Sequence, residues 1–318
     1  MRAGAPAALI LPGHAGAEAA RAGRPVCDDD RVTPATPAGP GPLASVVVPA
    51  HDEERSIARL LDQLAPGAGD ELLDVVVVCN GCTDATAAVA RGYDVTVEEI
   101  PQASKRAALE RGDAVARTYP RVYLDADVEI TAGDVLRLVA AVATGRYLAA
   151  GPRRVVPRDG VTTAVRWYYD VWESLPQVRT GLFGRGVVVV SQAGAERIHR
   201  LPMLMSDDLV MSEAFAPHER VVVPEATVVV HPPRSVPDLL RRRVRVATGN
   251  AQSDAAGRRS DSARTSVRSV AGVVIRRPGL ALKLPVFAAV TLAAHVGARR
   301  AVRHGDFTTW RRDESSRR

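Results

Sequence analysis

Short apolar strands alternate with amphipathic helices over residues 44–142, and this alternation limits the fold of the 318-residue chain more than any other feature. Residues 45–49 form a compact β-branched run, after which apolar side chains recur at helical spacing at Ile57, Leu60, Leu61 and Leu64. The same pattern predicts strands at residues 73–78, 95–100 and 122–124, and helices at 83–91, 106–117 and around 135–142. Strand and helix units repeated in this order indicate an α/β fold with a mostly parallel sheet.

The chain divides into three regions by composition. Residues 1–42 are rich in Ala, Gly and Pro without a sustained period, so we predict a disordered leader that cannot bury enough apolar surface to become ordered. Residues 43–252 form the main domain, which is regular over 43–150 and mixed over 151–252. Residues 253–318 are predicted to be a basic C-terminal region: a polar linker reaching about Ser269, an apolar helix and a charged tail.

Basic residues concentrate after His231, whereas the first 230 residues are net negative, although the whole chain has a formal charge of +6. Few aromatic residues lie among these arginines, which argues against nucleic acid and favours a membrane surface or a pyrophosphate as the partner. The apolar run over residues 280–296 is barely long enough for a spanning helix, which needs about 20 apolar residues. We expect this run to dock on a membrane or to be buried, with a single spanning helix as the alternative.

The three cysteines, Cys27, Cys79 and Cys82, are an odd number that argues against a disulfide framework. A reducing, cytoplasmic environment is therefore expected. Cys79 and Cys82 make a Cys-x-x-Cys pair, but there is no second pair to complete a zinc site, and Cys79 ends a Val-rich run. We favour a buried structural thiol over a redox pair.

Asp125, Ala126 and Asp127 follow directly after the strand predicted at residues 122–124. Ligands of open α/β sheets bind outside the carboxyl ends of the strands, so chemistry is expected at this position. Mg²⁺ or Mn²⁺ is commonly held by one or two carboxylates together with substrate phosphates. We expect Asp127 to be the main metal ligand and Asp125 to bridge toward a ribose or a metal-bound water. The alternative for so short a motif is a solvated turn.

Polar loops also follow the first two predicted strands. Their amide, imidazole and carboxylate groups can bind a nucleotide base and ribose in one crevice, and the candidates are Pro49, Ala50, His51, Asp52, Glu53, Asn80 and Asp84. Structural interpretations stay open beside this one. Acidic residues also favour the first turn of a helix, and Asn-Gly followed by Thr is typical of a turn with a helix cap.

In their order along the chain, these motifs resemble the family 2 glycosyltransferases with the GT-A fold, over about residues 45–252. The resemblance is carried by residues 46–54, 80–84, 125–127 and 181–186, and by the acidic pair Asp207 and Asp208. Residues 104–112, which include Lys105, are similar to the Gly-Lys-x-x-Ala-Leu-Asn-x-Gly helix that precedes the metal motif. Four positions depart from the family pattern: His51 replaces Asn, Asn80 replaces Asp, Glu110 replaces Asn and Asp207 replaces Glu.

This resemblance implies a GT-A fold with a nucleotide-binding half over 43–150, an acceptor-binding half over 151–252 and C-terminal helices. It implies inverting transfer from a nucleotide-diphosphate sugar with Mg²⁺ or Mn²⁺, and a nucleotide site that includes Lys105, Asp125 and Ala126. Asp208 is expected to be the catalytic base, with Asp207 as the second candidate. The expected acceptor is a hydroxyl of a lipid-linked, polysaccharide or small-molecule compound at the cytosolic membrane face, in cell-envelope, glycolipid or secondary-metabolite glycosylation.

Further candidates lie in the second half of the chain. In some relatives of this fold a histidine in the region of His231 completes the metal shell, and Arg242 and Arg245 can bind a diphosphate or lipid phosphate through forked hydrogen bonds. Trp167 belongs to an aromatic group suited to stacking on an acceptor sugar. The alternatives are a strand-end histidine with no ligand, a solvated basic helix face and aromatic core packing.

Two other functions compete. A sugar-nucleotide nucleotidyltransferase also needs an α/β sheet and a divalent cation, but its Gly-rich basic loop is absent because residues 49–54 are acidic. A non-catalytic scaffold binding nucleotide and membrane would not need the acidic motifs to be intact. A dinucleotide-dependent reductase is weaker, since no Gly-x-Gly-x-x-Gly follows the first strand.

Overall fold

A computed structural model of the protein describes residues 41–69, 72–201, 207–257, 260 and 263–304. Most of the predicted leader and all of the chain after residue 304 lie outside the described residues. The described chain belongs to one compact unit that begins at Pro40.

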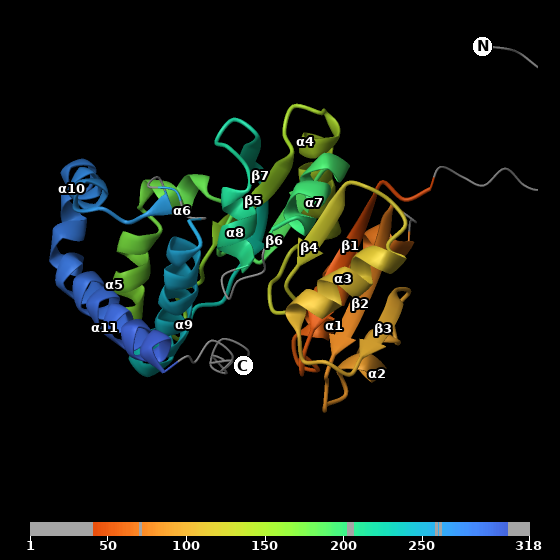
Figure 1. The fold of residues 1–318 in the computed structure, drawn as a ribbon, viewed down its shortest axis with the longest axis horizontal. Coiled ribbons are helices and arrows are strands. Elements are labelled where there is room, and N and C mark those ends of the chain that lie inside the picture. Colours follow the sequence, from red (N-terminus) through yellow and green to blue (C-terminus); the bar gives the residue numbers. More distant parts are fainter. Residues whose placement is uncertain (1–40, 70–71, 202–206, 258–259, 261–262, 305–318) are drawn as a thin grey trace, which may run out of the picture. The chain divides into compact units, whose positions relative to one another are not determined.

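Seven strands form one sheet in the order β3-β2-β1-β4-β6-β5-β7 (Figure 1). The strands are β1 (Ala44–Ala50), β2 (Leu73–Asn80), β3 (Thr96–Ile100), β4 (Arg121–Leu124), β5 (Ala149–Val155), β6 (Val187–Val190) and β7 (Arg220–Val229). β3, β2, β1 and β4 are parallel, whereas β6 runs antiparallel to both β4 and β5, and β5 pairs in parallel with β7. The predicted mostly parallel sheet with a mixed second half is confirmed.

Helices cover both faces of the sheet, as the period of the apolar residues predicts. The apolar faces of α1 (Ile57–Gly69) and α4 (Ala132–Ala143), together with the short α2 (Thr86–Ala90), pack on one face in the largest core cluster. On the other face lie α3 (Lys105–Val115), α7 (Gln192–His199) and α8 (Asp207–Glu213), whose buried side chains include Leu109, Ile198 and Met211. Burial on both faces explains why β1 and β2 are continuous apolar runs and do not alternate.

The remaining helices build a second core beside the sheet. They are α5 (Thr163–Trp172), α6 (Pro176–Thr180), α9 (Val236–Ala255), α10 (Val267–Arg276), η2 (Pro278–Lys283) and α11 (Leu284–Arg303). At its centre the rings of Tyr168 and Phe287 are stacked with centroids 5.3 Å apart. The aromatic group that begins at Trp167 is thus partly core: Tyr168 and Tyr169 are buried, while Trp167 is half-buried.

The linker predicted over residues 253–269 is shorter than the sequence suggested. α9 continues to Ala255, and α10 begins at Val267. A capping box starts α10, since the Ser266 side chain accepts from the Ser269 amide and the Ser269 side chain accepts from the Ser266 amide. The polar residues that precede this helix hid its start, and only Val273 on it is buried.

Candidate functional site

A cavity lies where the ends of β1 and β4 meet α3, β6 and α8. Its lining includes Pro49, Lys105, Asp125, Gly186 and Asp208, which come from five separate sequence motifs. The sheet topology explains their meeting, because the carboxyl ends of the parallel strands β1 and β4 share one edge. The antiparallel β6 then brings the end of the glycine-rich segment to that same edge.

Asp125 is fixed from two sides. Its backbone amide donates to the Gly186 carbonyl at 2.8 Å, and its Oδ1 lies 2.8 Å from Lys105 Nζ. Lys105 is the first residue of α3, whose N-cap Ser104 accepts a hydrogen bond from the Ala107 amide. Both side chains of this ion pair are partly exposed to the cavity, so a ligand can reach them.

Gly186 cannot be replaced by a larger residue without moving the acidic motif. Its φ of 68° lies in the left-handed region, and a Cβ there would come within 2.5 Å of Val128 Cγ1 and 3.2 Å of Asp125 Oδ2. The glycine therefore lets β6 approach the Asp125 carboxylate closely.

The carboxylates of Asp125, Asp127 and Asp208 all lie close enough to Arg245 of α9 to affect its pKa. Burial lowers the pKa of Arg245, and the neighbouring Arg242 lowers it further, while Asp127, Asp208 and Asp125 act in the opposite direction. Helix α9, more than a hundred residues away in sequence, thus brings positive charge to the acidic motif. Carboxylates gathered beside basic side chains suit a ligand that carries both phosphates and a cation.

Asp208 is exposed at the start of α8 and accepts two backbone hydrogen bonds. Its Oδ2 accepts from the Gly184 amide and its Oδ1 from the Leu209 amide, both at 2.7 Å. The carboxylate is therefore oriented at the mouth of the cavity that Asp125 also lines. Asp207 begins the same helix, but its side chain lies outside the described residues.

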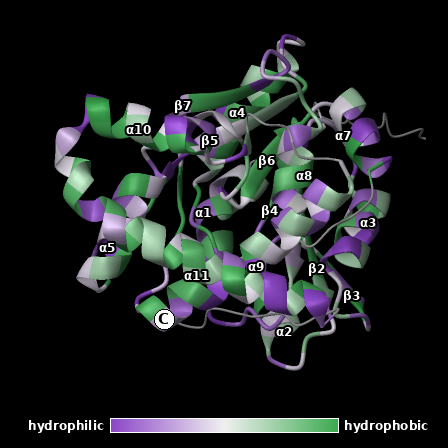
Figure 2. Cartoon of the chain, turned by 60° about the vertical axis from the view of Figure 1, so that its left-hand side comes forward, coloured by the Kyte–Doolittle hydropathy of each residue, from purple (hydrophilic) through white to green (hydrophobic). Residues whose placement is uncertain are grey.

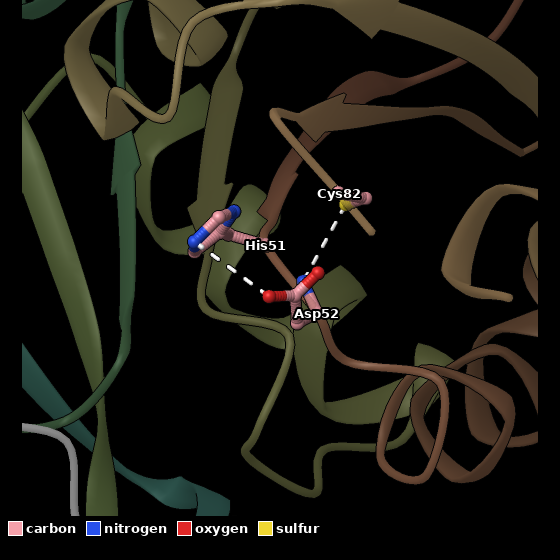
Figure 3. Close-up of side chains that lie close together, drawn as sticks. All are labelled: His51, Asp52 and Cys82. Carbon is pink, nitrogen blue, oxygen red and sulfur yellow. Dashed lines mark hydrogen bonds and ion pairs between the residues drawn. The ribbon is translucent and has the colours of Figure 1, made fainter. Parts of the chain in front are cut away.

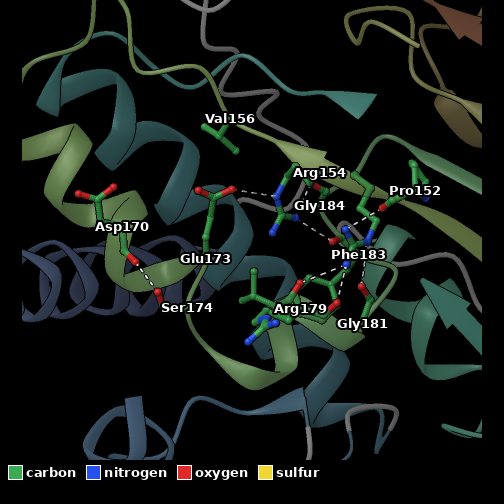
Figure 4. Close-up of polar contacts among 12 residues, drawn as sticks. Pro152, Arg154, Val156, Asp170, Glu173, Ser174, Arg179, Gly181, Phe183 and Gly184 are labelled. Carbon is green, nitrogen blue, oxygen red and sulfur yellow. Dashed lines mark hydrogen bonds and ion pairs between the residues drawn. The ribbon is translucent and has the colours of Figure 1, made fainter. Parts of the chain in front are cut away.

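Two buried arginines that the sequence analysis missed hold the glycine-rich segment in place (Figure 4). Arg185 donates to the carbonyls of Gly181, Pro152, Val178 and Arg179, and burial together with nearby Arg154 lowers its pKa to about 9. Arg154 donates to the Gly184 carbonyl at 2.8 Å and stacks over Trp172 at 4.3 Å. Arg185 and Arg154 thereby fix the backbone that binds Asp208.

The loops after β1 and β2 are bound to each other (Figure 3). His51 Nδ1 lies 2.6 Å from the Asn80 carbonyl, and Asp52 Oδ1 accepts from the Thr83 amide at 2.7 Å. Asp52 adopts a positive φ of 50°, which is rare for a non-glycine residue and often found at functional sites. Together His51, Asp52 and Cys82 bring a ring nitrogen, a carboxylate oxygen and a sulfur within 4.8 Å of one another.

Other residues of these loops make further contacts within them and with the neighbouring strand. Asn80 is buried and its amide donates to the Ala50 carbonyl at 2.7 Å. The Glu53 carbonyl accepts the amides of Ser56 and Ile57 where α1 begins. Burial alone would raise the pKa of Asp84, but hydrogen bonds from Thr86 and the Glu54 amide lower it below its usual value. These are the contacts expected if the residues form a turn and begin a helix, which was the structural interpretation of these positions.

His231 lies after β7 and belongs to a polar chain. Its Nε2 lies 2.6 Å from Glu129 Oε1, which also accepts from Arg59 at 3.0 Å, and Arg242 donates to the His231 carbonyl at 3.1 Å. Burial alone would raise the pKa of Glu129, but contacts with His231 and Arg59 lower it below its usual value. Glu129 was missed, although acidic residues alternate at positions 125, 127 and 129.

Cys79 matches the structural interpretation, a buried thiol at the end of a Val-rich strand. Cys79 is 1% exposed, and burial, reinforced by the neighbouring Cys82, raises its pKa to about 12. A thiol with so high a pKa is a poor nucleophile at neutral pH.

The chain is similar to several known proteins. The sequence profile of glycosyl transferase family 2 matches residues 45–194. Uncharacterized glycosyltransferases from Mycobacterium bovis and Mycobacterium tuberculosis are 34% identical to it over 116 residues, which are 36% of this chain. The match spans only about half (51%) of the length of those relatives.

The fold is shared with a mannosyltransferase from Pyrobaculum calidifontis that was solved in complex with GDP-Man and Mn²⁺. The two structures align with a TM-score of 0.53 at 21% identity, covering 84% of this chain and 80% of the other. Residues 45–194, which contain the β1 loop, the acidic motif and the glycine-rich segment, are the part of this chain that matches glycosyl transferase family 2, and the chain has the GT-A fold.

Proposed function

We propose that the protein transfers a sugar from a nucleotide-diphosphate sugar to an acceptor hydroxyl, with inversion at the anomeric carbon. The observation that carries this proposal is the cavity that joins Lys105, Asp125 and Asp208. A cation, an acidic motif and an exposed carboxylate are the groups that this reaction needs around one sugar. The glycosyltransferase relatives and the GDP-Man complex of the structural neighbour support it.

The nucleotide is assigned to the crevice between the β1 and β2 loops. Pro49, Ala50, His51, Asp52 and Glu53 would line its base and ribose on one side, and Asn80 and Asp84 on the other. Lys105, next to Asp125 and Ala126, would then meet the diphosphate, since its ammonium group already lies against a carboxylate at the cavity. The base therefore binds at one end of the crevice and the departing phosphates at the other.

Mg²⁺ or Mn²⁺ fits the residues at the diphosphate end. Asp127 and Asp125 offer partly exposed carboxylate oxygens, the donors these hard cations prefer. His231 is the third candidate ligand, and Glu129 orients its ring as carboxylates commonly orient metal-bound histidines. The cation would neutralise charge on the nucleoside diphosphate as it leaves.

Asp208 is the proposed general base, with Asp207 second. The Asp208 carboxylate removes the proton of the acceptor hydroxyl while that oxygen bonds to the anomeric carbon, and the bond from this carbon to the diphosphate oxygen breaks. The Gly184 and Leu209 amides orient the carboxylate for this transfer. A positioned base contributes roughly 10²- to 10⁴-fold to the rate.

Arg242, Arg245 and Trp167 complete the proposed acceptor side. Arg245 is close enough to the three carboxylates to affect their charge balance, and it can bind a phosphate of the donor or acceptor. Trp167 offers a half-buried ring on α5 for an acceptor sugar. We place the protein in the cytoplasm at the cytosolic membrane face, with a lipid-linked, polysaccharide or small-molecule hydroxyl as acceptor.

The test compares Asp208→Asn with Asp159→Asn, which changes an exposed carboxylate on the loop after β5. Both proteins are supplied with Mn²⁺ and a panel of nucleotide sugars, and release of nucleoside diphosphate and pyrophosphate is measured. Asp208→Asn should lose roughly 10²-fold or more of the transfer rate and keep donor affinity, while the control should match the parent. Equal rates in all three proteins would refute the assignment, and pyrophosphate release would indicate a nucleotidyltransferase.

A further inference from the structure

Exposed apolar side chains are concentrated on one part of the molecule. Within the described residues seven large apolar side chains are exposed, and all but Leu43 lie on α10, η2 and α11. We call these six the docking face: Val267, Ile275, Leu282, Leu292, Val296 and Val302. Single exposed apolar residues are ordinary, but a set gathered on consecutive elements marks an interaction surface.

The same elements carry unneutralised positive charge. Residues 262–305 contain eight Arg and Lys residues and no Asp or Glu. The arginines at 268, 276, 299, 300 and 303 are exposed, and none of them pairs with a carboxylate in the part of the chain that the structure describes. Some exposed arginines elsewhere do have such partners, as Arg91 has Glu99 and Arg137 has Asp134.

Packing shows which side of α11 is already occupied. Phe287, Val290, Ala294, Ala298 and Ala301 recur at helical spacing and are buried, and the helix runs along α9 and α5 (Figure 1). Its start is anchored to α5, because Lys283 Nζ lies 2.7 Å from Asp170 Oδ2.

The opposite side of α11 remains exposed. The segment Pro278–Arg303 is long and apolar enough to cross a membrane, yet only 22% of its most apolar window is buried. Figure 2 shows apolar residues interleaved with hydrophilic ones along α10 and α11. A helix attached lengthwise to its own domain can lie in the plane of a membrane surface without leaving that domain.

We propose that the docking face binds an anionic lipid bilayer, with α11 lying parallel to the surface and its arginines among the lipid headgroups. The apolar side chains enter the boundary between headgroups and acyl chains, and the acid-free sequence supplies the attraction to negative lipids. This surface rests on the membrane placement proposed above and gives it a structural basis, and it does not depend on the transferase activity.

The experiment measures sedimentation of the full chain with phosphatidylcholine vesicles, with and without phosphatidylglycerol. Binding should require the anionic lipid and weaken as salt is raised. The triple variant Ile275→Ser, Leu282→Ser, Leu292→Ser should lose at least tenfold in partitioning. Leu43→Ser, which changes the one exposed large apolar residue on the rest of the described chain, should bind like the parent.

A second set of variants tests the charges separately. The variant Arg276→Gln, Arg299→Gln, Arg300→Gln should lose roughly a hundredfold, because each arginine near a negative surface contributes about fivefold. Removing three exposed arginines elsewhere, with Arg91→Gln, Arg137→Gln and Arg200→Gln, keeps the same net charge as that variant and should leave binding nearly unchanged.

Several outcomes would overturn the proposal. Equal binding to vesicles without anionic lipid would remove the role of the arginines, and bound protein that salt cannot release but detergent can would indicate a spanning helix. Binding to duplex DNA that the arginine variant loses, without binding to vesicles, would make the face a nucleic-acid surface. A dimer that light scattering detects and the serine variant disperses would make it a contact between two copies.

Discussion

Lys105 Nζ lies 2.8 Å from Asp125 Oδ1, so the first residue of α3 contacts the residue that follows β4. Both side chains are partly exposed at the cavity, where an ion pair adds little to stability. The pair is instead suited to function, because a diphosphate entering beside Asp125 gains the ammonium group as a partner.

Replacing Lys105 by Met should weaken nucleoside diphosphate binding by roughly 10- to 100-fold, since a hydrogen bond to a charged group contributes about 1.5–3 kcal/mol. The melting temperature should change little. The matched control is Arg106→Met on the same helix, whose side chain pairs with Glu110 on the exposed surface. Calorimetric titration with UDP and GDP decides the matter, and equal affinities for the two variants would count against the assigned role of Lys105.

Gly186→Ala should damage the site more than Gly160→Ala. Both glycines have positive φ, at 68° and 69°, so both substitutions carry a backbone cost of about 1–2 kcal/mol. Only at Gly186 does the added Cβ meet Val128 and Asp125, whereas nothing lies within 4 Å at Gly160. We expect lower metal-dependent donor affinity for Gly186→Ala alone, measured beside urea unfolding of both variants. Matching losses in the two proteins would show that the contact with Asp125 is unimportant.

Glu129→Gln should weaken Mn²⁺ binding by roughly 10- to 100-fold if the contact with His231 orients a ligand, the range typical of outer-shell partners of metal sites. His231→Ala should weaken it at least as much. Glu99→Gln, which removes an exposed partner of Arg91, serves as control. Free Mn²⁺ can be followed by electron paramagnetic resonance in the presence of the nucleotide, and unchanged affinity in His231→Ala would exclude this histidine from the shell.

Asp74 should make the stability of the fold depend on pH. Burial alone would raise the pKa of this carboxyl, but hydrogen bonds from Ser45 and Arg117 hold it below its usual value. Because the folded-state pKa is the lower one, this stabilisation is complete above the unfolded value of about 3.9 and is lost as pH falls through the folded pKa. Asp74→Asn should lower the unfolding free energy by about 1–3 kcal/mol at neutral pH.

The difference between Asp74→Asn and the parent should shrink in acid, as measured by urea unfolding at neutral and acidic pH. Asp159→Asn, an exposed carboxyl, provides the baseline. A loss from Asp74→Asn that stays constant at all pH values would mean that its ionisation does not stabilise the fold.

Local patterns were enough to predict the first half of the fold. The strands β1 and β2 are visible in the sequence because burial on both faces leaves continuous Val-rich runs. The helices α1 and α4 each show their own period. The meeting of Lys105, Asp125 and Asp208 was expected only through the family resemblance. The structure brings them to one cavity because β6 enters the sheet next to β4.

Other features depend on pairing between distant segments. Glu129 meets His231 across 102 residues, and Arg185 finds four carbonyls only after the glycine-rich segment has folded around it. Neither contact has a periodic signal. The start of helix α10 was missed for a different reason: a polar stretch precedes it, and its capping box, Ser266 with Ser269, has Ser where Glu or Gln is usual.

Helix α9 lies between the proposed membrane-binding helix α11 and the acidic residues of the candidate site. It has 20 residues and is therefore about 30 Å long. One of its sides packs along α11, while Arg245 on another approaches Asp127 and Asp208. On a bilayer this rigid rod limits the height of the reaction above the lipid to about its own length. An acceptor rooted in the same leaflet then needs only a short spacer between its lipid and its hydroxyl, and it is found by diffusion in two dimensions.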